Sequence, residues 1–248
     1  MQSRVIGVIE SCFREKFGTP RQGALVPEAP ARLRIRPEFM PEHALQGLEE
    51  FSHVWLLFEF HLNTNKVFRP KIHPPRLQGK TVGLFASRSP HRPTPIGLTL
   101  ARLERIQGDT LYLSGVDLVN STPILDVKPY ISSCDRPVRA RTGWVRRCRA
   151  PRMRVRFAPK ALEDISLLVP ARGRARLKRL ISKSLSHDPR NPRDRAQLRP
   201  EKELAFFILH YDAYFRVSGG QAIISRVTKA DEASRRRPPL QTGFWLGA

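Results

Sequence analysis

The segment that most constrains this chain is the run RSPHRPTPIGL at residues 88–98. Proline fixes φ and lacks a backbone N–H, so the three prolines within six residues here exclude a helix and a central strand. Apolar runs at 81–86 and 96–101 flank the segment and predict buried strands. We therefore expect a stiff loop held between core strands, as a binding site requires. A Pro-rich surface connection would explain the prolines but not the clustered Arg88, His91 and Arg92.

The charge of the chain points to a polyanionic partner. Of its 248 residues, 44 are Lys or Arg and 22 are Asp or Glu, which gives a formal net charge of +22. A field of this size attracts nucleic acid. An anionic membrane is the competing partner, but the sequence has no basic amphipathic helix with an aromatic face and no lipidation motif. We therefore expect nucleic acid as the partner and no membrane.

The sequence predicts a cytoplasmic protein without a metal site. It has no apolar run of about 18 residues, and its first residues, MQSRVIG, lack the apolar core of a signal peptide. The three cysteines, Cys12, Cys134 and Cys148, are odd in number and share no C-x-x-C spacing. This pattern argues against a disulfide framework and a zinc site, so we expect reduced thiols.

Residues 1–150 carry short apolar runs separated by turn residues, which predicts an antiparallel sheet or barrel. The most apolar run, 51–60, predicts a strand that is buried on both faces. A short helix is expected at 41–50, and Gly108 followed by Asp109 is typical of a hairpin turn. No G-x-G-x-x-G or Walker A motif is present, so a Rossmann-type nucleotide site is not expected. The remaining strands are expected at 4–13, 31–36, 81–86, 96–106, 110–119 and 124–130.

The composition changes toward the C-terminal part, where we expect a smaller α+β domain. Residues 136–157 hold nine arginines and no acidic side chain, which a polyanionic partner explains better than a solvated face does. Trp144 within this stretch either stacks on a base or anchors the core, and we favour the anchor. Helices are expected at 159–168 and 172–186, strands at 152–157, 204–217 and 221–227, and a mobile basic tail at 229–248.

A turn and a pair of histidines offer further polar groups. Arg21 and Gln22 add donors to the tip of the turn FGTPRQG, so anion or amide recognition competes with the plain turn, which we favour. His53 and His61 project from one face of the most apolar strand. About 26 Å of strand separates them, which rules out a shared metal. Each is expected to satisfy a hydrogen bond at its end of the strand.

Residues 117–130 form the second unusual stretch. Asp117 and Asp126 bracket a turn built from Asn, Ser, Thr and Pro. Asp126 lies inside an apolar run, where an unpaired carboxylate is costly, so it must meet a donor such as Arg88 or Arg92. A structural ion pair and a ligand-binding role are equally compatible with this pattern.

Taken together, these segments resemble the TsaA-like, or TrmO-type, family of tRNA methyltransferases. The resemblance spans residues 1–227, and its strongest pieces are 88–98 and 117–130. The other matching motifs are FGTPRQ at 17–22, GLEEFSHVW at 47–55, FH at 60–61, RP at 69–70, PPRL at 74–77 and DPR at 188–190. Any one of these motifs is weak alone, whereas the ordered set is specific.

The resemblance implies N6-methylation of threonylcarbamoyl-adenosine at position 37 of a tRNA anticodon loop, with S-adenosyl-L-methionine as the cofactor. It also implies a homodimer of mainly β chains, with an antiparallel β-barrel methyltransferase domain at 1–150 and a small α+β domain at 151–228 that contacts tRNA. The family's motifs place cofactor binding at Pro20, Arg21, Gln22, His61, Leu62, Arg88, Leu98, Ser114, Gly115, Val116 and Asp117.

Methyl transfer requires the protein to align two reactants and to exclude water. The sulfonium of the cofactor is cationic, so Asp117 and carbonyl groups suit it better than arginines do. Arginine forks suit carboxylates and phosphates. We therefore assign Arg88 to the cofactor, and His91 and Arg92 to the modified base. The candidate bases for the N6 proton are Asp126, His91 and Tyr130. The alternative function is a non-catalytic RNA-binding barrel.

Overall fold

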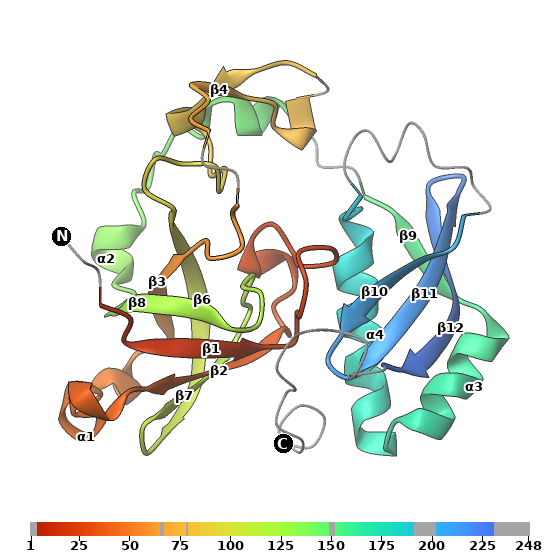
Figure 1. The fold of residues 1–248 in the computed structure, drawn as a ribbon, viewed down its shortest axis with the longest axis horizontal. Coiled ribbons are helices and arrows are strands. Elements are labelled where there is room, and N and C mark those ends of the chain that lie inside the picture. The colour runs from red at the N-terminus through yellow and green to blue at the C-terminus, as the bar shows by residue number, and fades with distance from the viewer. Residues whose placement is uncertain (1–3, 65–66, 78, 149–151, 191–201, 231–248) are drawn as a thin grey trace. The chain divides into compact units, whose positions relative to one another are not determined.

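The computed structural model describes residues 4–64, 67–77, 79–148, 152–190 and 202–230 (Figure 1). The chain divides into two compact units. The first comprises residues 1–9, 32–113 and 122–151, and the second comprises 10–31, 114–121 and 152–248. The expected basic tail lies outside the described residues from position 231 onward.

A closed antiparallel β-barrel dominates the N-terminal part of the chain, as the sequence predicts. Its strands follow the order β1-β2-β7-β6-β3-β8, and closure leaves no free sheet edge. The turn between β6 and β7 falls at Gly108, whose φ of 59° suits a tight hairpin. The strand bounds are β1 Gly7–Ser11, β2 Pro30–Ile35, β3 His53–Glu59, β6 Ile96–Gln107, β7 Thr110–Ser114 and β8 Thr122–Pro129.

One face of β3 fills the barrel. Val54, Leu56 and Phe58 are buried, whereas the residues between them are only half-buried. The prediction of a strand buried on both faces is therefore wrong for the outer face, because a barrel buries only its inner surface when nothing else covers it. Gly97 of β6 stands opposite Phe58, and the Phe58 ring occupies the space that a side chain at position 97 would need.

Residues 81–86 do not form the single strand that was expected. β5 (Val82–Gly83) pairs with β4 (Lys71–Ile72), and the chain then enters a short 3₁₀ turn, η5 (Leu84–Ala86). Only Leu84 of this run is deeply buried, so the run offers no alternating apolar face for a longer strand. The apolar composition was misleading because it lacked the period of a strand.

The helix expected at 41–50 is replaced by two shorter turns. They are α1 (Pro41–Ala44) and η3 (Leu48–Glu50), and Gly47 between them has a φ of 82°. The strand expected at 110–119 likewise ends earlier, at Ser114. The other short helices are η1 Gly23–Leu25, η2 Pro37–Phe39, η4 Pro75–Leu77, α2 Ser132–Asp135 and η6 Gly143–Arg147.

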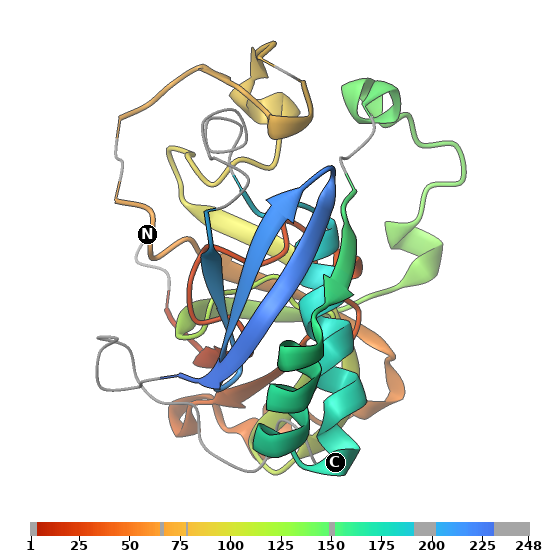
Figure 2. The same ribbon diagram turned by 90° about the vertical axis from the view of Figure 1, so that its right-hand side faces the viewer.

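The C-terminal part of the second unit is a four-stranded sheet with two helices packed on it (Figure 2). The sheet order is β10-β11-β12-β9, and β12 and β9 run parallel. The helices α3 (Pro159–Leu168) and α4 (Ala171–Ser186) form where the sequence predicts them. The strand bounds are β9 Arg154–Phe157, β10 Leu204–Ile208, β11 Tyr211–Ser218 and β12 Gln221–Lys229. The expected α+β architecture is therefore confirmed.

The run at 204–217 is two strands rather than the one that was expected. The chain reverses at Leu209 and His210, although neither is a typical turn residue. Leu209 adopts a φ of 56° and is fully buried, and its N–H donates to the carbonyl of Cys12 at 2.9 Å. Tertiary contacts therefore hold a turn that the local sequence does not signal.

Asp164 of α3 supports strand β12 of this sheet. Its carboxylate accepts the Val227 N–H of β12 at 3.0 Å and pairs with Lys160 Nζ at 2.9 Å. Burial alone would raise the pKa of Asp164, but the Lys160 and Val227 hydrogen bonds hold it below its ordinary value of 3.8. A group with a lowered folded pKa stabilises the fold above its unfolded pKa, and this stabilisation is lost as the pH falls through the folded pKa.

We expect Asp164→Ala to lower the free energy of unfolding by about 1–3 kcal/mol at neutral pH, because it leaves the Val227 N–H without its acceptor. Asp164→Asn keeps an acceptor and loses only the ion pair with an exposed lysine, so it should cost less. Urea unfolding at pH 7 and pH 3 measures both effects. An equal loss in the two variants at pH 7 would contradict the acceptor role, and a loss for Asp164→Asn that is as large at pH 3 would contradict the ion pair.

Candidate functional site

The loop expected at 88–98 ends at residue 95, because β6 begins at Ile96, and two hydrogen bonds tie it to the end of β3. The Asn63 side chain donates to the Pro90 carbonyl at 2.9 Å, and the Phe60 N–H donates to the Pro95 carbonyl at 2.8 Å. The expected cofactor residues His61 and Leu62 lie between these two anchor points in the sequence. The structure therefore brings His61 and Leu62 together with the loop that carries the arginines.

Arg92 braces the loop from within. Its Nη1 donates to the Ser87 carbonyl at 3.0 Å, and its guanidinium carbon lies 5.6 Å from the centre of the Phe85 ring. The Phe85 ring is 75% exposed, so this cation–π contact lies at the surface. Further bonds within the loop join the Arg92 N–H to the Pro90 carbonyl and the His91 N–H to Ser89 Oγ. The loop thus has a fixed internal framework that presents Arg92 and His91.

Phe85 is a residue beside the candidate site that the sequence reasoning missed, and Asn63 holds the loop in place. Asn63 follows His61 and Leu62 directly, and its amide is the group that holds Pro90. The exposed Phe85 precedes the loop within a run that was taken for a buried strand. The sequence around Phe85 does not alternate between apolar and polar residues, and this is the signal that argues against a buried strand there.

Leu98 and Asp126 lie in one row on the outer face of the barrel. Leu57 of β3 stands opposite Leu98 on β6 and opposite Asp126 on β8. The side chains of such cross-strand partners share a face of the sheet. Leu98 is 51% exposed, which leaves an apolar surface beside the carboxylate.

Asp126 meets a donor, as expected, but the cation that pairs with it is Lys128 rather than Arg88 or Arg92. Lys128 Nζ lies 2.9 Å from Asp126 Oδ2, and the Val127 N–H donates to Asp126 Oδ1. Residues two apart in a strand share a face, which explains the pairing. The side chain of Asp126 is 43% exposed, so water also offsets its charge.

Tyr130 belongs to an aromatic cluster at the other end of β3. Its ring centre lies 6.3 Å from that of His53 and 6.0 Å from that of Trp55. Its N–H donates to the His53 carbonyl at 3.0 Å, whereas the Pro-rich loop joins the chain beyond Glu59. About 20 Å of strand separates those ends. Within one chain, Tyr130 is therefore not brought together with Arg92 and His91.

Trp144 acts as an anchor in the arginine-rich stretch. Its indole N–H donates to the carbonyl of Ala86 at 2.8 Å, so it fixes η6 to the residues just before the loop. Trp144 is only half-buried, so it links η6 to the residues before the loop and does not anchor the core as the sequence predicts. The arginines Arg141, Arg146 and Arg147 around it are exposed.

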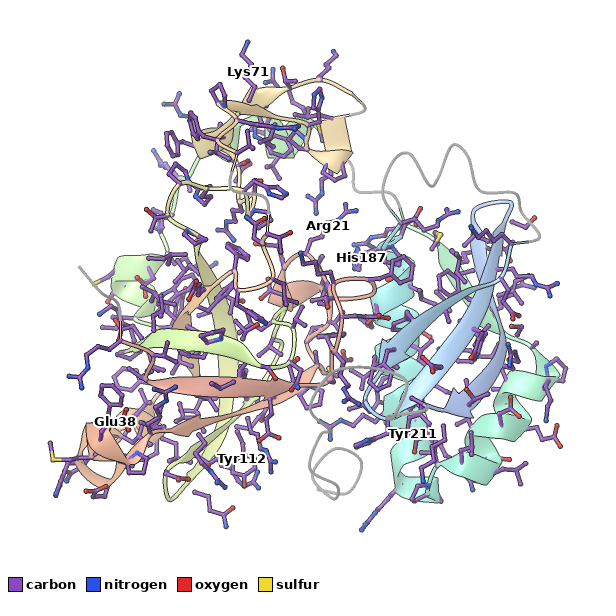
Figure 3. The ribbon with its side chains drawn as sticks, viewed as in Figure 1. Arg21, Glu38, Lys71, Tyr112, His187 and Tyr211 are labelled. Carbon is purple, nitrogen blue, oxygen red and sulfur yellow. The ribbon has the colours of Figure 1, made fainter. Side chains whose placement is uncertain are left out.

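The expected cofactor residues at 20–22 and 114–117 belong to the second unit, and Figure 3 labels Arg21 among them. Arg21 is exposed, and the Gln22 amide donates to the Arg21 carbonyl at 2.6 Å. The turn at 114–117 lies beside the segment that follows them, since a Cβ on Gly115 would be 3.6 Å from the Pro27 carbonyl oxygen. The structure therefore brings the 20–22 segment and the 114–117 turn into one neighbourhood.

The FGTPRQ turn has a structural basis in this unit. Gly18 adopts a φ of 84°, a region that favours glycine, and it packs directly on the Phe206 ring of β10. Thr19 Oγ1 donates to the Glu15 carbonyl at 2.6 Å, and Glu15 Oε1 accepts the Phe207 N–H at 3.2 Å. These contacts fix the backbone just before Arg21.

Within the part of the chain that the structure describes, no group of His, Cys, Asp and Glu side chains is arranged to hold a metal ion. No helix there is both long and apolar enough to cross a membrane.

The barrel and its loops are similar to known proteins of one family. Residues 8–136 match the family model described as the tRNA-methyltransferase O N-terminal domain. The tRNA (adenine(37)-N6)-methyltransferase of Escherichia coli is 35% identical over 222 residues, which cover 88% of this chain and 93% of that protein. The mouse protein of the same name is 54% identical over 134 residues, which cover 53% of this chain and 31% of the mouse protein.

The match thus spans about a third of the length of the mammalian relatives. A crystal structure of TrmO from Pseudomonas aeruginosa has a TM-score of 0.74 and 32% identity, and the alignment covers 92% of this chain and 98% of that one. The chain is therefore a member of a β-barrel class that differs from the Rossmann fold. It belongs to the tRNA-methyltransferase O family.

Proposed function

We propose that this protein transfers a methyl group from S-adenosyl-L-methionine to N6 of adenosine 37 in tRNA. Relatives that carry the name tRNA (adenine(37)-N6)-methyltransferase support this activity, and so does the net charge of +22. The observation that carries the proposal is the braced loop at 88–95, which presents His91 and Arg92 next to the end of β3. A non-catalytic RNA-binding barrel has no need for such a loop.

The finer proposal is that the base carries a threonylcarbamoyl group. A free carboxylate on the substrate suits a guanidinium fork, and Arg92 uses only one of its donors on Ser87. The exposed position of His91 beside it offers a second polar group to the same anion. Cytoplasmic tRNA is the proposed substrate pool.

The residues of the expected cofactor site fit S-adenosyl-L-methionine chemically. In the first unit, Arg88 is a cation suited to its carboxylate, and Leu62 and Leu98 are apolar surfaces suited to its adenosine. In the second unit, Arg21 is a cation of the same kind. The buried backbone of Ser114, Gly115 and Val116 offers peptide groups, and Asp117 is an anion for a cationic centre. When bound, the cofactor supplies an electrophilic methyl group.

The protein's own residues then have three tasks. Arg92 and His91 hold and orient the modified base, which lowers the entropic cost of the displacement. Asp126 is the best-placed acceptor for the N6 proton, because it shares the outer barrel face with Leu98. Tyr130 lies at the far end of β3, which makes it a weaker candidate within one chain.

A homodimer is part of the proposal. The outer face of β6 exposes Ile96 by 40% and Leu98 by 51%, and the neighbouring β3 adds the half-buried Leu57 and Trp55. An apolar face of this kind on a barrel favours association with a second copy.

Incubation with S-adenosyl-L-methionine and tRNA tests the activity. We expect mass spectrometry of the digested tRNA to reveal a methylated threonylcarbamoyl-adenosine. The matched control is a tRNA with unmodified A37, which should gain no methyl group if the threonylcarbamoyl substituent is recognised. No mass gain on any tRNA, together with no cofactor binding in calorimetry, would favour the RNA-binding barrel instead.

A further inference from the structure

A cationic groove lies in the second unit, within the sheet-and-helix part of the chain. Its volume is about 580 Å³, and its walls come from α4, the start of β9 and the loop that carries η1. The groove contains none of the expected cofactor or catalytic residues. Its polar lining includes the cations Arg152, Lys178, Arg179 and Lys183 and the hydroxyls of Ser182 and Ser186.

The sequence of α4 produces this groove. Leu177, Leu180, Ile181 and Leu185 are buried at helical spacing, so they face the sheet. Residues 178, 179, 182, 183 and 186 follow the opposite spacing and line the groove. No acidic residue occurs between 171 and 186, so nothing on the helix offsets the charge.

Two hydrogen bonds fix the walls of the groove. The Met153 N–H donates to the Ser186 carbonyl at 2.8 Å, which ties the start of β9 to the end of α4. Ser186 Oγ donates to the Lys183 carbonyl at 2.8 Å. The groove is therefore held by backbone contacts and does not depend on its own cations.

The four cations are available to a ligand. Among the described residues, none of them has a carboxylate within ion-pair distance, whereas the nearby Arg190 is fully engaged by Asp188 at 2.9 and 3.0 Å. Arg152, Arg179 and Lys183 are exposed, and Lys178 is half-buried. Four like charges in one groove repel one another, and an anion would relieve that repulsion.

We infer that this groove binds the phosphodiester backbone of tRNA. This inference rests on the proposed function, because it names a second contact for the same substrate. Arg152 and the three cations of α4 can each neutralise a phosphate, and Ser182 can donate a hydroxyl hydrogen bond.

The lining also indicates which part of the tRNA the groove contacts. Among the described residues that line it there is no Phe, Tyr or Trp on which a base could stack. Its contacts should therefore be with the backbone and should not depend on the tRNA sequence. An acidic protein segment would satisfy the same charges, but we favour tRNA because it is the substrate of the proposed reaction.

The test is tRNA binding by the full chain at several salt concentrations, measured by fluorescence anisotropy. The triple variant Lys178→Gln, Arg179→Gln and Lys183→Gln should bind about ten- to a hundredfold more weakly. Its slope of log affinity against log salt should fall by about 2 to 3, since each phosphate contact contributes about one. The loss should be equal for two tRNAs of different sequence.

The matched control removes the same charge elsewhere in the unit. Arg154→Gln, Arg156→Gln and Arg172→Gln alter exposed cations that do not line the groove. An equal loss of tRNA affinity in this control would mean that net charge alone explains the effect, which would overturn the inference. So would an unchanged salt slope in the groove variant, or binding to phosphatidylserine vesicles or polyglutamate that depends on the three residues while tRNA binding does not.

Methylation kinetics separate this inference from the proposed function. With a working wild-type enzyme, the groove variant should have a higher KM for tRNA and an unchanged kcat at saturating tRNA. An unchanged KM would overturn the groove and leave the activity standing. If the wild-type protein does not methylate tRNA, the proposed function fails, and the salt-dependence measurement still decides whether the groove binds tRNA.

Discussion

Replacing Arg92 by alanine should reduce kcat/KM for tRNA methylation by at least about a hundredfold, which is the scale of losing one well-placed positioning contact. The fold should stay intact. The substitution removes one hydrogen bond to the Ser87 carbonyl and one surface contact with Phe85, in a loop that Asn63 and Phe60 anchor independently. Such a loss should cost about 1 kcal/mol of unfolding free energy or less. A fully active Arg92→Ala protein would contradict the assignment of Arg92 to the modified base.

Two further variants separate substrate contact from loop bracing. Arg92→Gln keeps a neutral amide donor on a shorter side chain but removes the charge and the fork, so it should be nearly as inactive as Arg92→Ala. Phe85→Ala removes the ring beside the guanidinium and should reduce activity by only a few-fold. If Arg92→Gln restored most of the activity, bracing of the loop would be the role of Arg92. Steady-state kinetics with threonylcarbamoylated tRNA, together with thermal unfolding, distinguish these outcomes.

The parts of the fold that the sequence predicts well are those with a clear hydrophobic period. The helix at 171–186 shows such a period, and its apolar face is buried as expected. The strand at 96–107 also forms, but it buries Thr99, Ala101 and Leu103 and exposes Ile96 and Leu98. The hairpin at Leu209 has no local signal, because its conformation depends on the Cys12 carbonyl almost two hundred positions away in the sequence. Residues 81–86 have a strand's composition without its alternation, and composition alone misleads there.

The candidate site divides in a similar way. Motifs identify segments with a role beyond packing, such as residues 88–98. Prolines and arginines are costly in a segment that only packs in the core, so their clustering indicates such a role. Motifs do not predict which side chains meet. Asp126 pairs with Lys128 because residues two apart in β8 share a face. Tyr130 lies a strand length from Arg92 because of the register of β3 with β8. Register depends on the whole barrel, so one segment cannot reveal it.

Gly18→Ala should be the most destabilising small substitution in the FGTPRQ turn. Gly18 adopts a φ of 84°, where an L side chain costs about 1–2 kcal/mol. A Cβ there would also overlap the Phe206 ring, which is fully buried and has no room to retreat. Overpacking of this kind costs a further 1–3 kcal/mol or so. The free energy of unfolding in urea should therefore fall by about 2–5 kcal/mol, and cofactor affinity should fall as the segment that carries Arg21 is displaced.

The contribution of the Phe206 contact can be isolated within the same unit. Gly220 in the turn between β11 and β12 has a φ of 73° with nothing within 4 Å of the position a Cβ would take, so Gly220→Ala should cost only the backbone term. In the Gly18→Ala background, Phe206→Leu should be less harmful than in the wild type, because the shorter side chain relieves the overlap. Equal costs for Gly18→Ala and Gly220→Ala, with additive effects of Phe206→Leu, would contradict this explanation. In that case Gly18 would be needed only for its backbone conformation. Phe206→Leu would then leave the cofactor affinity measured by calorimetry unchanged.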